Sequence, residues 1–166
     1  DWKAHGWTDM KQAIAVSSDV YFYSIGGGFE DQKGLGVLKI EEYSKLFGMG
    51  EETGVDLPDE KNGVIPNPDW KLKNFKGDPW RLGDTFNTSI GQYGFQVTPM
   101  EINRAVAGLA NNGTLLTPHF ILGTETEKRN LSKDISKEYY DVVHEGMRQA
   151  VSYGTAVALN VPYVEV

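Results

Sequence analysis

The stretch Ala13-Ile14-Ala15-Val16-Ser17-Ser18-Asp19-Val20-Tyr21-Phe22-Tyr23 places three polar residues between two apolar segments with the composition of helices. Buried hydroxyls and carboxylates that find no partner cost roughly 1–3 kcal/mol each. Ser17-Ser18-Asp19 is therefore either a helix junction with its caps, or part of a cleft in which the polar groups do chemistry. Which of the two holds decides what the protein does.

Composition narrows the classes of protein. The chain has 166 residues, about the size of one domain, and a formal net charge of −7, which argues against a nucleic-acid partner. Cysteine is absent, which excludes disulfides, zinc–thiolate sites and cysteine nucleophiles. No apolar run approaches the roughly 18–20 residues of a membrane span. The first residue is Asp1 and the chain ends on a strand-like segment, so we expect a segment cut from a longer protein.

The apolar residues on either side of the polar triplet predict two short helices. The first covers residues 9–16, with Thr8 as its N-cap. The second covers residues 20–25, with Asp19 as its N-cap and the glycines at 26–28 as its end.

Three further helices follow from spacing and capping signals. Apolar residues three or four apart predict a helix over 37–47 that Gly48 stops. Thr98-Pro99-Met100-Glu101 has the form of a capping box with proline at N1, and Ser136 begins the last long helix. The side chains expected to face inward are Val37, Ile40, Tyr43 and Phe47, then Ile102, Ala105, Val106, Leu109 and Ala110, and finally Tyr140, Val143, Met147 and Val151.

The rest of the chain predicts loops and short strands. Residues 51–83 are rich in proline and glycine and predict a long ordered loop with at most a short strand near 55–57. Its three large aromatic residues predict that it packs down on the domain. We expect extended chain over 114–122 and a polar turn over 124–133. The alternating segment Val161–Val166 predicts a strand, of which Tyr163 to Val166 would enter a sheet.

Other candidate sites receive less support. His5, His119 and His144 lie in different local settings, and nothing favours a Ser-His-Asp triad. Asp1, His5 and Asp9 have helical spacing, but without a further ligand a solvated face is favoured over a metal site. The run Ser89-Ile90-Gly91-Gln92-Tyr93-Gly94 is not a P-loop. It is interpreted as a tight turn, with a ligand-approaching loop as the alternative.

Ser17-Ser18-Asp19 followed by Val20-Tyr21-Phe22-Tyr23 resembles the Ser-x-Asn/Asp motif of class B penicillin-binding proteins, most closely the elongation (rod-shape) type. Further fragments similar to this family follow in the right order. They are Phe47-Gly48-Met49-Gly50, Thr53-Gly54-Val55-Asp56-Leu57, Pro79-Trp80, Gly83-Asp84-Thr85, Ser89-Ile90-Gly91-Gln92, Thr98-Pro99, Asn112-Gly113 and Gly154-Thr155-Ala156. Their order and spacing extend the resemblance over nearly the whole chain.

The resemblance implies a serine D,D-transpeptidase that cross-links peptidoglycan stem peptides through an acyl-serine intermediate and is covalently inhibited by β-lactams. It implies an α/β (α+β), mostly helical fragment of the transpeptidase, or β-lactamase-like, fold. Of the three family motifs the chain holds only the second. Ser-x-x-Lys and Lys-Thr/Ser-Gly are absent, and Thr8-Asp9-Met10-Lys11 has Thr in place of Ser. Residues 1–166 are therefore expected to be part of a single transpeptidase domain between those motifs, and inactive alone.

The catalytic residues that the resemblance implies are Ser17 and Asp19. A hydroxyl both donates and accepts, so Ser17 would relay a proton between the lysine of the first motif and the leaving amine or β-lactam nitrogen. Asp19 stands where many relatives have Asn, and would hold that lysine or the substrate backbone. The implied partners are stem peptides, β-lactams and a membrane glycosyltransferase of the elongation machinery, at the extracytoplasmic face of the bacterial membrane. No cofactor or metal is implied.

Two other functions stay open at this point. The chain could belong to a transpeptidase-like protein that has lost its chemistry and serves as a β-lactam sensor or scaffold. It could also be an unrelated acidic, helical interaction domain. In that last case Ser17 would be a buried cap far from any cleft.

Overall fold

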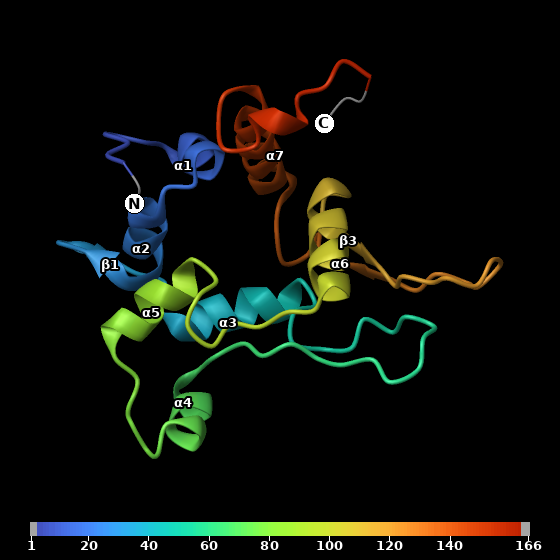
Figure 1. Ribbon diagram of the computed structural model, residues 1–166, viewed down its shortest axis with the longest axis horizontal. Helices are drawn as coiled ribbons and strands as arrows, with labels where there is room; N and C mark the ends of the chain where they lie inside the picture. Colours follow the sequence, from blue (N-terminus) through green and yellow to red (C-terminus); the bar gives the residue numbers. More distant parts are fainter. Residues whose placement is uncertain (1–2, 164–166) are drawn as a thin grey trace.

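The computed structural model describes residues 3–163 (Figure 1). Within that range seven α-helices, one 3-10 helix and two antiparallel two-stranded ribbons confirm the mostly helical α+β fold. The helices are α1 (Met10–Val16), α2 (Asp19–Gly27), α3 (Val37–Leu46), α4 (Pro68–Asn74), α5 (Leu82–Ser89), α6 (Pro99–Ala110), α7 (Lys137–Ser152) and η1 (Val157–Leu159). The strands are β1 (Gly28–Phe29), β2 (Gln32–Lys33), β3 (Thr114–Leu116) and β4 (Lys128–Asn130). None of these helices is long and apolar enough to cross a bilayer.

Helix α1 packs mainly against α7, and the two lie close together in Figure 1. Ala13 and Ala15 of α1 and Val151 of α7 are buried there. A Cβ placed on Gly146 of α7 would lie 3.0 Å from the Cβ of Ile14, so a glycine is what allows this close approach. The buried face of α1 thus follows from small residues on both helices.

Helix α2 packs against α5, again through glycines. A Cβ on Gly26 would lie 1.7 Å from the Ser89 Oγ atom, and one on Gly27 would lie 2.1 Å from the Phe86 ring. The prediction that the glycines end the helix after Ile25 was wrong, because α2 continues through Gly27. Glycine serves here for close packing of two helices, and only Gly28, with φ of 93°, ends the helix.

The start of α1 also differs from the prediction. Asp9, and not Thr8, is the N-cap, since its carboxylate accepts a hydrogen bond of 2.8 Å from the Gln12 N–H. The Gln12 side chain accepts one of 3.3 Å from the Asp9 N–H in return, which completes a capping box. Gln12 at the N3 position selects Asp9, because the reciprocal pair satisfies two otherwise unpaired backbone donors.

Residues 51–83 do not form an unbroken loop. They contain α4 and the first residues of α5, and the chain at 55–57 is not a strand. Asn67 caps α4 by accepting a 2.8 Å hydrogen bond from the Trp70 N–H, and Pro68 occupies its first turn.

The prediction that this segment packs down is confirmed by an aromatic cluster. The Trp70 ring lies 5.5 Å from Phe75 and 5.8 Å from Tyr93, and Trp80 also lies 5.8 Å from Tyr93, centroid to centroid. Tyr93 belongs to the tight turn after α5. A Cβ on the next residue, Gly94, would lie 2.1 Å from the Trp70 ring, which supports the turn interpretation of this segment.

The capping box predicted for α6 is confirmed, since the Thr98 hydroxyl accepts from the Glu101 N–H at 3.1 Å. Its buried face differs from the prediction, because Ile102 and Val106 are 42% and 44% exposed, whereas Glu101 is completely buried. Of the predicted apolar stripe Ala105 is buried, and the carboxylate of Glu101, bonded to backbone N–H groups, faces inward on the same helix. Tyr43 of α3 and Met147 of α7 are likewise exposed, at 44% and 37%.

The predictions for the polar turn over 124–133 and for the last strand also change. The polar segment 124–133 contains β4, in which Arg129 pairs with Leu115 of β3. After α7 the chain forms η1, and residues 161–163 form no strand, because the Val161 N–H bonds back to the Leu159 carbonyl at 2.9 Å and Pro162 has no N–H to give. Residues 164–166 lie outside the described part of the chain.

Candidate functional site

Ser17 ends helix α1 in the left-handed conformation, with φ of 55° and ψ of 58°. Its N–H bonds to the Ile14 carbonyl at 3.3 Å, and the Ser18 N–H bonds to the Ala13 carbonyl at 3.0 Å. This is the turn that usually carries glycine after a helix, because a Cβ in this conformation costs roughly 1–2 kcal/mol. A serine therefore occupies a position at which glycine would fit with less strain.

The Ser17 side chain is exposed, and its hydroxyl makes no hydrogen bond to the part of the chain that the structure describes. The expectation of a buried cap, which belonged to the interaction-domain alternative, is thus contradicted. The hydroxyl is also not used as a cap, since the turn is closed by backbone N–H groups alone. Both features leave the Ser17 oxygen available to a group from outside this chain.

Ser18 and Asp19 begin the next helix. Ser18, 4% exposed, is the N-cap of α2, and Asp19 is its first residue and half-buried. The prediction of Asp19 as the N-cap was wrong by one position. A carboxylate in the first turn interacts favourably with the positive end of the helix dipole. The backbone of the triplet is thus a helix junction, and the Ser17 side chain has no part in closing it.

A depression of about 670 Å³ lies beside this junction. Of the triplet only Ser18 lines it, so neither Ser17 nor Asp19, the residues chosen from the sequence, lies in its wall. The spacing alone gave no signal for Ser18, because the middle residue of the motif carries no assigned chemistry. The other lining residues are Lys3, Ala4, His5, Gly6, Trp7, Thr8, Val20, Tyr21, Ser24, Ile25, Phe29 and Gln32.

Two of the three histidines serve other parts of the fold. His144 on α7 makes a 2.7 Å hydrogen bond with the Leu109 carbonyl of α6, and His119 contacts the Thr126 hydroxyl at 3.2 Å. Neither contact reaches the Ser17 junction. Asp1, one of the three residues considered for a metal, lies outside the described residues, and residues 3–163 contain no group of three or more His, Cys, Asp or Glu side chains suited to a metal.

An ion-pair cluster centred on the buried Lys71 joins α4 to α5. The Lys71 ammonium, 3% exposed, lies 2.7 Å from Asp84 and 2.9 Å from Asp78. Arg81 makes two further hydrogen bonds to Asp78, at 2.7 and 2.6 Å, and together Arg81 and Lys71 lower the pKa of that carboxyl to about 2. Burial acts to raise the pKa of Asp84, but the hydrogen bonds from Lys71 and the Arg81 N–H outweigh it and lower the pKa. The cluster anchors the segment that carries the aromatic rings.

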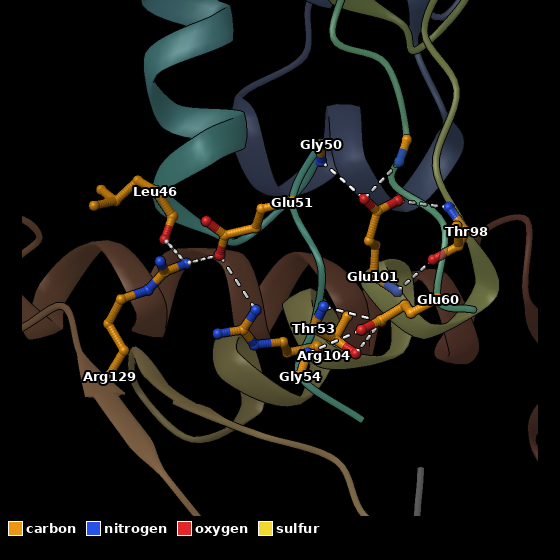
Figure 2. Close-up of polar contacts among 11 residues, drawn as sticks. Leu46, Gly50, Glu51, Thr53, Gly54, Glu60, Thr98, Glu101, Arg104 and Arg129 are labelled. Atoms are coloured by element: carbon orange, nitrogen blue, oxygen red, sulfur yellow. Dashed lines mark hydrogen bonds and ion pairs between the residues drawn. The ribbon is translucent and has the colours of Figure 1, made fainter. Parts of the chain in front are cut away.

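Glu101 joins three separate segments (Figure 2). Its Oε1 atom accepts from the Gly50 N–H at 3.0 Å and the Gly63 N–H at 2.8 Å, and its Oε2 atom accepts from the Thr98 N–H at 2.6 Å. Because the side chain is fully buried, these three donors replace water around the carboxylate. Glu101 thus fixes the loops that run between α3 and α6.

The fold and the Ser-x-Asp junction are consistent with a transpeptidase-like protein, and comparison with known proteins shows this class directly. Residues 1–166, the whole chain, match the family described as the penicillin binding protein transpeptidase domain. The chain belongs to this family.

Named relatives specify the branch that the chain is similar to. The peptidoglycan D,D-transpeptidase MrdA of Acinetobacter baumannii is 33% identical over an alignment 177 positions long, which covers 100% of this chain and 25% of the relative. The protein of the same name from Haemophilus influenzae is 38% identical over 75% of this chain and 18% of the relative. The chain thus spans about a quarter or less of the length of these relatives.

Solved structures agree with this assignment. The penicillin-binding protein PBP2 from Helicobacter pylori is similar with a TM-score of 0.81 and 35% identity, over 92% of this chain and 28% of that chain. A complex between PBP2 and MreC from the same organism gives a TM-score of 0.80 and 36% identity, over 95% of this chain and 29% of the solved chain. The elongation-type resemblance found in the sequence is therefore confirmed.

Proposed function

We propose that this chain is the part of a peptidoglycan D,D-transpeptidase domain that lies between a Ser-x-x-Lys motif and a Lys-Thr/Ser-Gly motif, and that Ser17 and Asp19 are its contribution to the active site. The observation that carries the proposal is the exposed Ser17 hydroxyl on a left-handed residue. The name of the MrdA relatives supports the reaction, and the share of their length that the chain spans supports its place within a larger protein.

The strain at Ser17 supports a role in chemistry. A non-glycine residue in this conformation costs free energy that the fold does not need, since glycine would close the same turn. Strained residues of this kind concentrate at functional sites, where the side chain is required. An oxygen exposed, unpaired within the described chain and held on a rigid turn suits a proton relay, because a hydroxyl can donate and accept at the same time.

The proposed chemistry is acyl transfer to a serine of the first motif. A lysine takes the proton of that serine, the serine oxygen bonds to the carbonyl carbon of the donor stem peptide, and the C–N bond to the leaving amine breaks. Ser17 passes a proton from the lysine to the departing nitrogen. An acceptor amine then bonds to the acyl carbon, the ester C–O bond to the serine breaks, and the proton lost by the amine returns to the serine oxygen by way of the lysine. Asp19 accepts a hydrogen bond from the lysine or from a substrate amide.

The surroundings follow from the same proposal. The substrates are peptidoglycan stem peptides, β-lactams acylate the same serine, and the domain works at the extracytoplasmic face of the bacterial membrane. A membrane glycosyltransferase of the elongation machinery is the proposed partner. The names of the relatives support the peptidoglycan substrate, and a related PBP2 of Helicobacter pylori solved in complex with MreC supports a protein partner.

The proposal is tested on the full-length protein by intact-mass analysis after incubation with benzylpenicillin. We expect one covalent adduct, whose rate of formation falls about 100-fold or more in Ser17→Ala, the range typical for loss of a proton-transfer group. Ser132→Ala, which alters another exposed serine, is the control and should acylate at the wild-type rate.

Two outcomes would count against the proposal. An unchanged acylation rate in Ser17→Ala would remove the relay role. Failure of the folded wild-type protein to form any adduct would favour a scaffold that has lost its chemistry, and Ser17-Ser18-Asp19 would then be a helix junction only.

A further inference from the structure

The turn after α7 lies directly against the end of α1. The Thr155 N–H donates a 3.0 Å hydrogen bond to the Ala15 carbonyl. A Cβ placed on the preceding residue, Gly154, would lie 1.9 Å from that same carbonyl oxygen. Gly154 does not have a left-handed φ, so glycine is required here for space alone. The contact is a close backbone approach between segments far apart in the sequence.

This contact gives the Ala15 carbonyl, in the last turn of α1, its hydrogen-bond donor. The carbonyls in the last turn of a helix have no partner within the helix. Those of Ala13 and Ile14 accept from the N–H groups of Ser18 and Ser17, which shape the left-handed turn. The carbonyl of Ala15 accepts from Thr155, and Ala15 is fully buried, so it depends on this one donor rather than on water.

The turn that supplies the donor is itself fixed to α7. The Gly154 N–H bonds to the Gln149 carbonyl at 3.1 Å, and the Ala156 N–H bonds to the Ala150 carbonyl at 3.0 Å. Gly146, two turns earlier on α7, brings the same helix against Ile14. Helix α1 is therefore held against α7 at two places, at Ile14 and at Ala15. The contact at Ala15 lies two residues from Ser17.

We propose that Gly154 and Thr155 are positioning residues for Ser17, which act by clamping the Ala15 carbonyl and so fixing where the Ser17 oxygen points. The inference rests on the proposed function of Ser17. A misplacement of about 1 Å in a reacting group can cost on the order of 100-fold in rate, so a displaced turn affects the chemical step more than the binding of the inhibitor.

The test is Gly154→Ala in the full-length protein. The added Cβ must push the Ala15 carbonyl away. We expect the first-order acylation rate constant at saturating benzylpenicillin to fall at least tenfold, while the concentration for half-maximal rate changes less than threefold. Hydrogen–deuterium exchange of residues 13–19 should become faster, because the Ser17 and Ser18 N–H bonds depend on this turn.

Three variants accompany it. Gly108→Ala places a Cβ 2.3 Å from the Leu115 side chain and destabilises the fold away from Ser17, so its rate constant should stay within twofold of wild type. Gly83→Ala meets nothing within 4 Å and should change neither rate nor stability for the worse. Gly146→Ala presses on Ile14 more mildly and should lower the rate by a smaller factor. It replaces Gly154→Ala if that variant does not fold.

The inference is overturned if folded Gly154→Ala acylates at the wild-type rate. It is also overturned if Gly108→Ala, at the same decrease in thermal midpoint as Gly154→Ala, loses as much of its acylation rate. Absence of an adduct on the wild-type protein would refute the proposed function separately. The exchange of residues 13–19 would then still decide whether the clamp holds α1: faster exchange in Gly154→Ala supports it, and unchanged exchange overturns it.

Discussion

At the scale of single residues, Ser17 illustrates a conflict between folding and function. Its backbone adopts a conformation that glycine adopts with less strain, and its side chain contributes no hydrogen bond within the described chain. A residue selected for stability alone would be glycine or asparagine. The presence of serine therefore indicates that the hydroxyl serves something other than the fold.

Replacement Ser17→Gly separates these two roles. The variant should be as stable as wild type or up to about 1 kcal/mol more stable, since relief of strain is partly offset by the greater freedom of glycine in the unfolded chain. Its acylation by benzylpenicillin should fall as far as that of Ser17→Ala. Stability is measured by urea unfolding and acylation by intact mass.

Ser44→Gly, in the interior of α3, is the matched control. It should lose roughly 1–2 kcal/mol of stability, because glycine is unfavourable within a helix and the 2.7 Å hydrogen bond from the Ser44 hydroxyl to the Ile40 carbonyl is lost, and it should keep full acylation. If Ser17→Gly were destabilised by as much as Ser44→Gly, the argument from backbone strain would be wrong.

At the scale of elements, Glu101 sets the arrangement of the loops around α6. One buried carboxylate accepts backbone N–H groups from Gly50, Gly63 and Thr98 (Figure 2). Next to it, Glu51 contacts Arg104 of α6 at 3.2 Å and Arg129 of β4 at 2.9 Å. Besides the aromatic cluster, carboxylate contacts thus hold the loops between α3 and α6.

We expect Glu101→Ala to lower the free energy of unfolding by about 3 kcal/mol or more, because three buried N–H groups lose their acceptor. Glu101→Gln should also be destabilising, since its NH₂ group would face a donor that now bonds to oxygen. Urea unfolding measures both. Glu125→Ala, in an exposed loop, should stay within about 0.5 kcal/mol of wild type. A loss below about 1 kcal/mol in Glu101→Ala would contradict this view of the loops.

The sequence predicted elements whose signals are local. The capping box at Thr98 and Glu101 and the start of α7 at Ser136 were confirmed, because each involves residues within one turn. Helix α4 was missed although Asn67-Pro68 gave a capping signal, since proline and glycine around it favoured a loop. The bonds from Gly50 and Gly63 to Glu101 could not be predicted, because nothing in the local pattern indicates which distant N–H groups meet a buried carboxylate.

At the scale of the whole molecule, several carboxylates are held by hydrogen bonds that favour the charged form. The Phe120 and Ile121 N–H groups lower the pKa of Asp56. For Glu60, burial opposes the shift, but hydrogen bonds from Thr53 and Gly54 outweigh it and lower the pKa. Asp78 and Asp84 of the Lys71 cluster behave alike. These carboxylates connect segments that lie between residues 53 and 121.

The sign of their pH dependence follows. A carboxyl whose pKa is lower in the folded protein contributes stability above its ordinary pKa and loses it as the pH falls through the lowered value. The thermal midpoint should therefore hold between pH 7 and 5, and fall between about pH 4.5 and 2, from the ordinary pKa of Glu60 to the lowered pKa of Asp78. Scanning calorimetry across this range measures it.

Asp78→Asn tests the assignment within the same experiment. The variant should start from a lower midpoint at pH 7 and lose less of it on acidification, because one of the responsible carboxyls is gone. Asp31→Asn, in the exposed turn between β1 and β2, should follow the wild-type curve. Parallel curves for Asp78→Asn and wild type would show that the Lys71 cluster is not a source of the acid response.

The candidate site was predictable in part. The Ser-x-Asp pattern and its apolar flanks identified the junction, because the motif is contiguous. The sequence did not show that Ser18 caps α2 or that Ser17 is exposed. Both follow from the left-handed turn at Ser17, and the turn after α7 supports that turn through the bond from Thr155 to Ala15. No local pattern reports such a contact between segments this far apart.

The bond from Thr155 to Ala15 also has a consequence for biosynthesis. A chain made from its N-terminus exposes α1 and Ser17 early, but the turn that holds them emerges only after nearly everything between has been made. Contacts of such long sequence separation form late, since closing the intervening loop costs entropy first. The Ser17 junction is therefore among the last parts to reach its final structure. A chain whose synthesis stops before Thr155 would contain Ser17-Ser18-Asp19 without the hydrogen bond that fixes the end of α1.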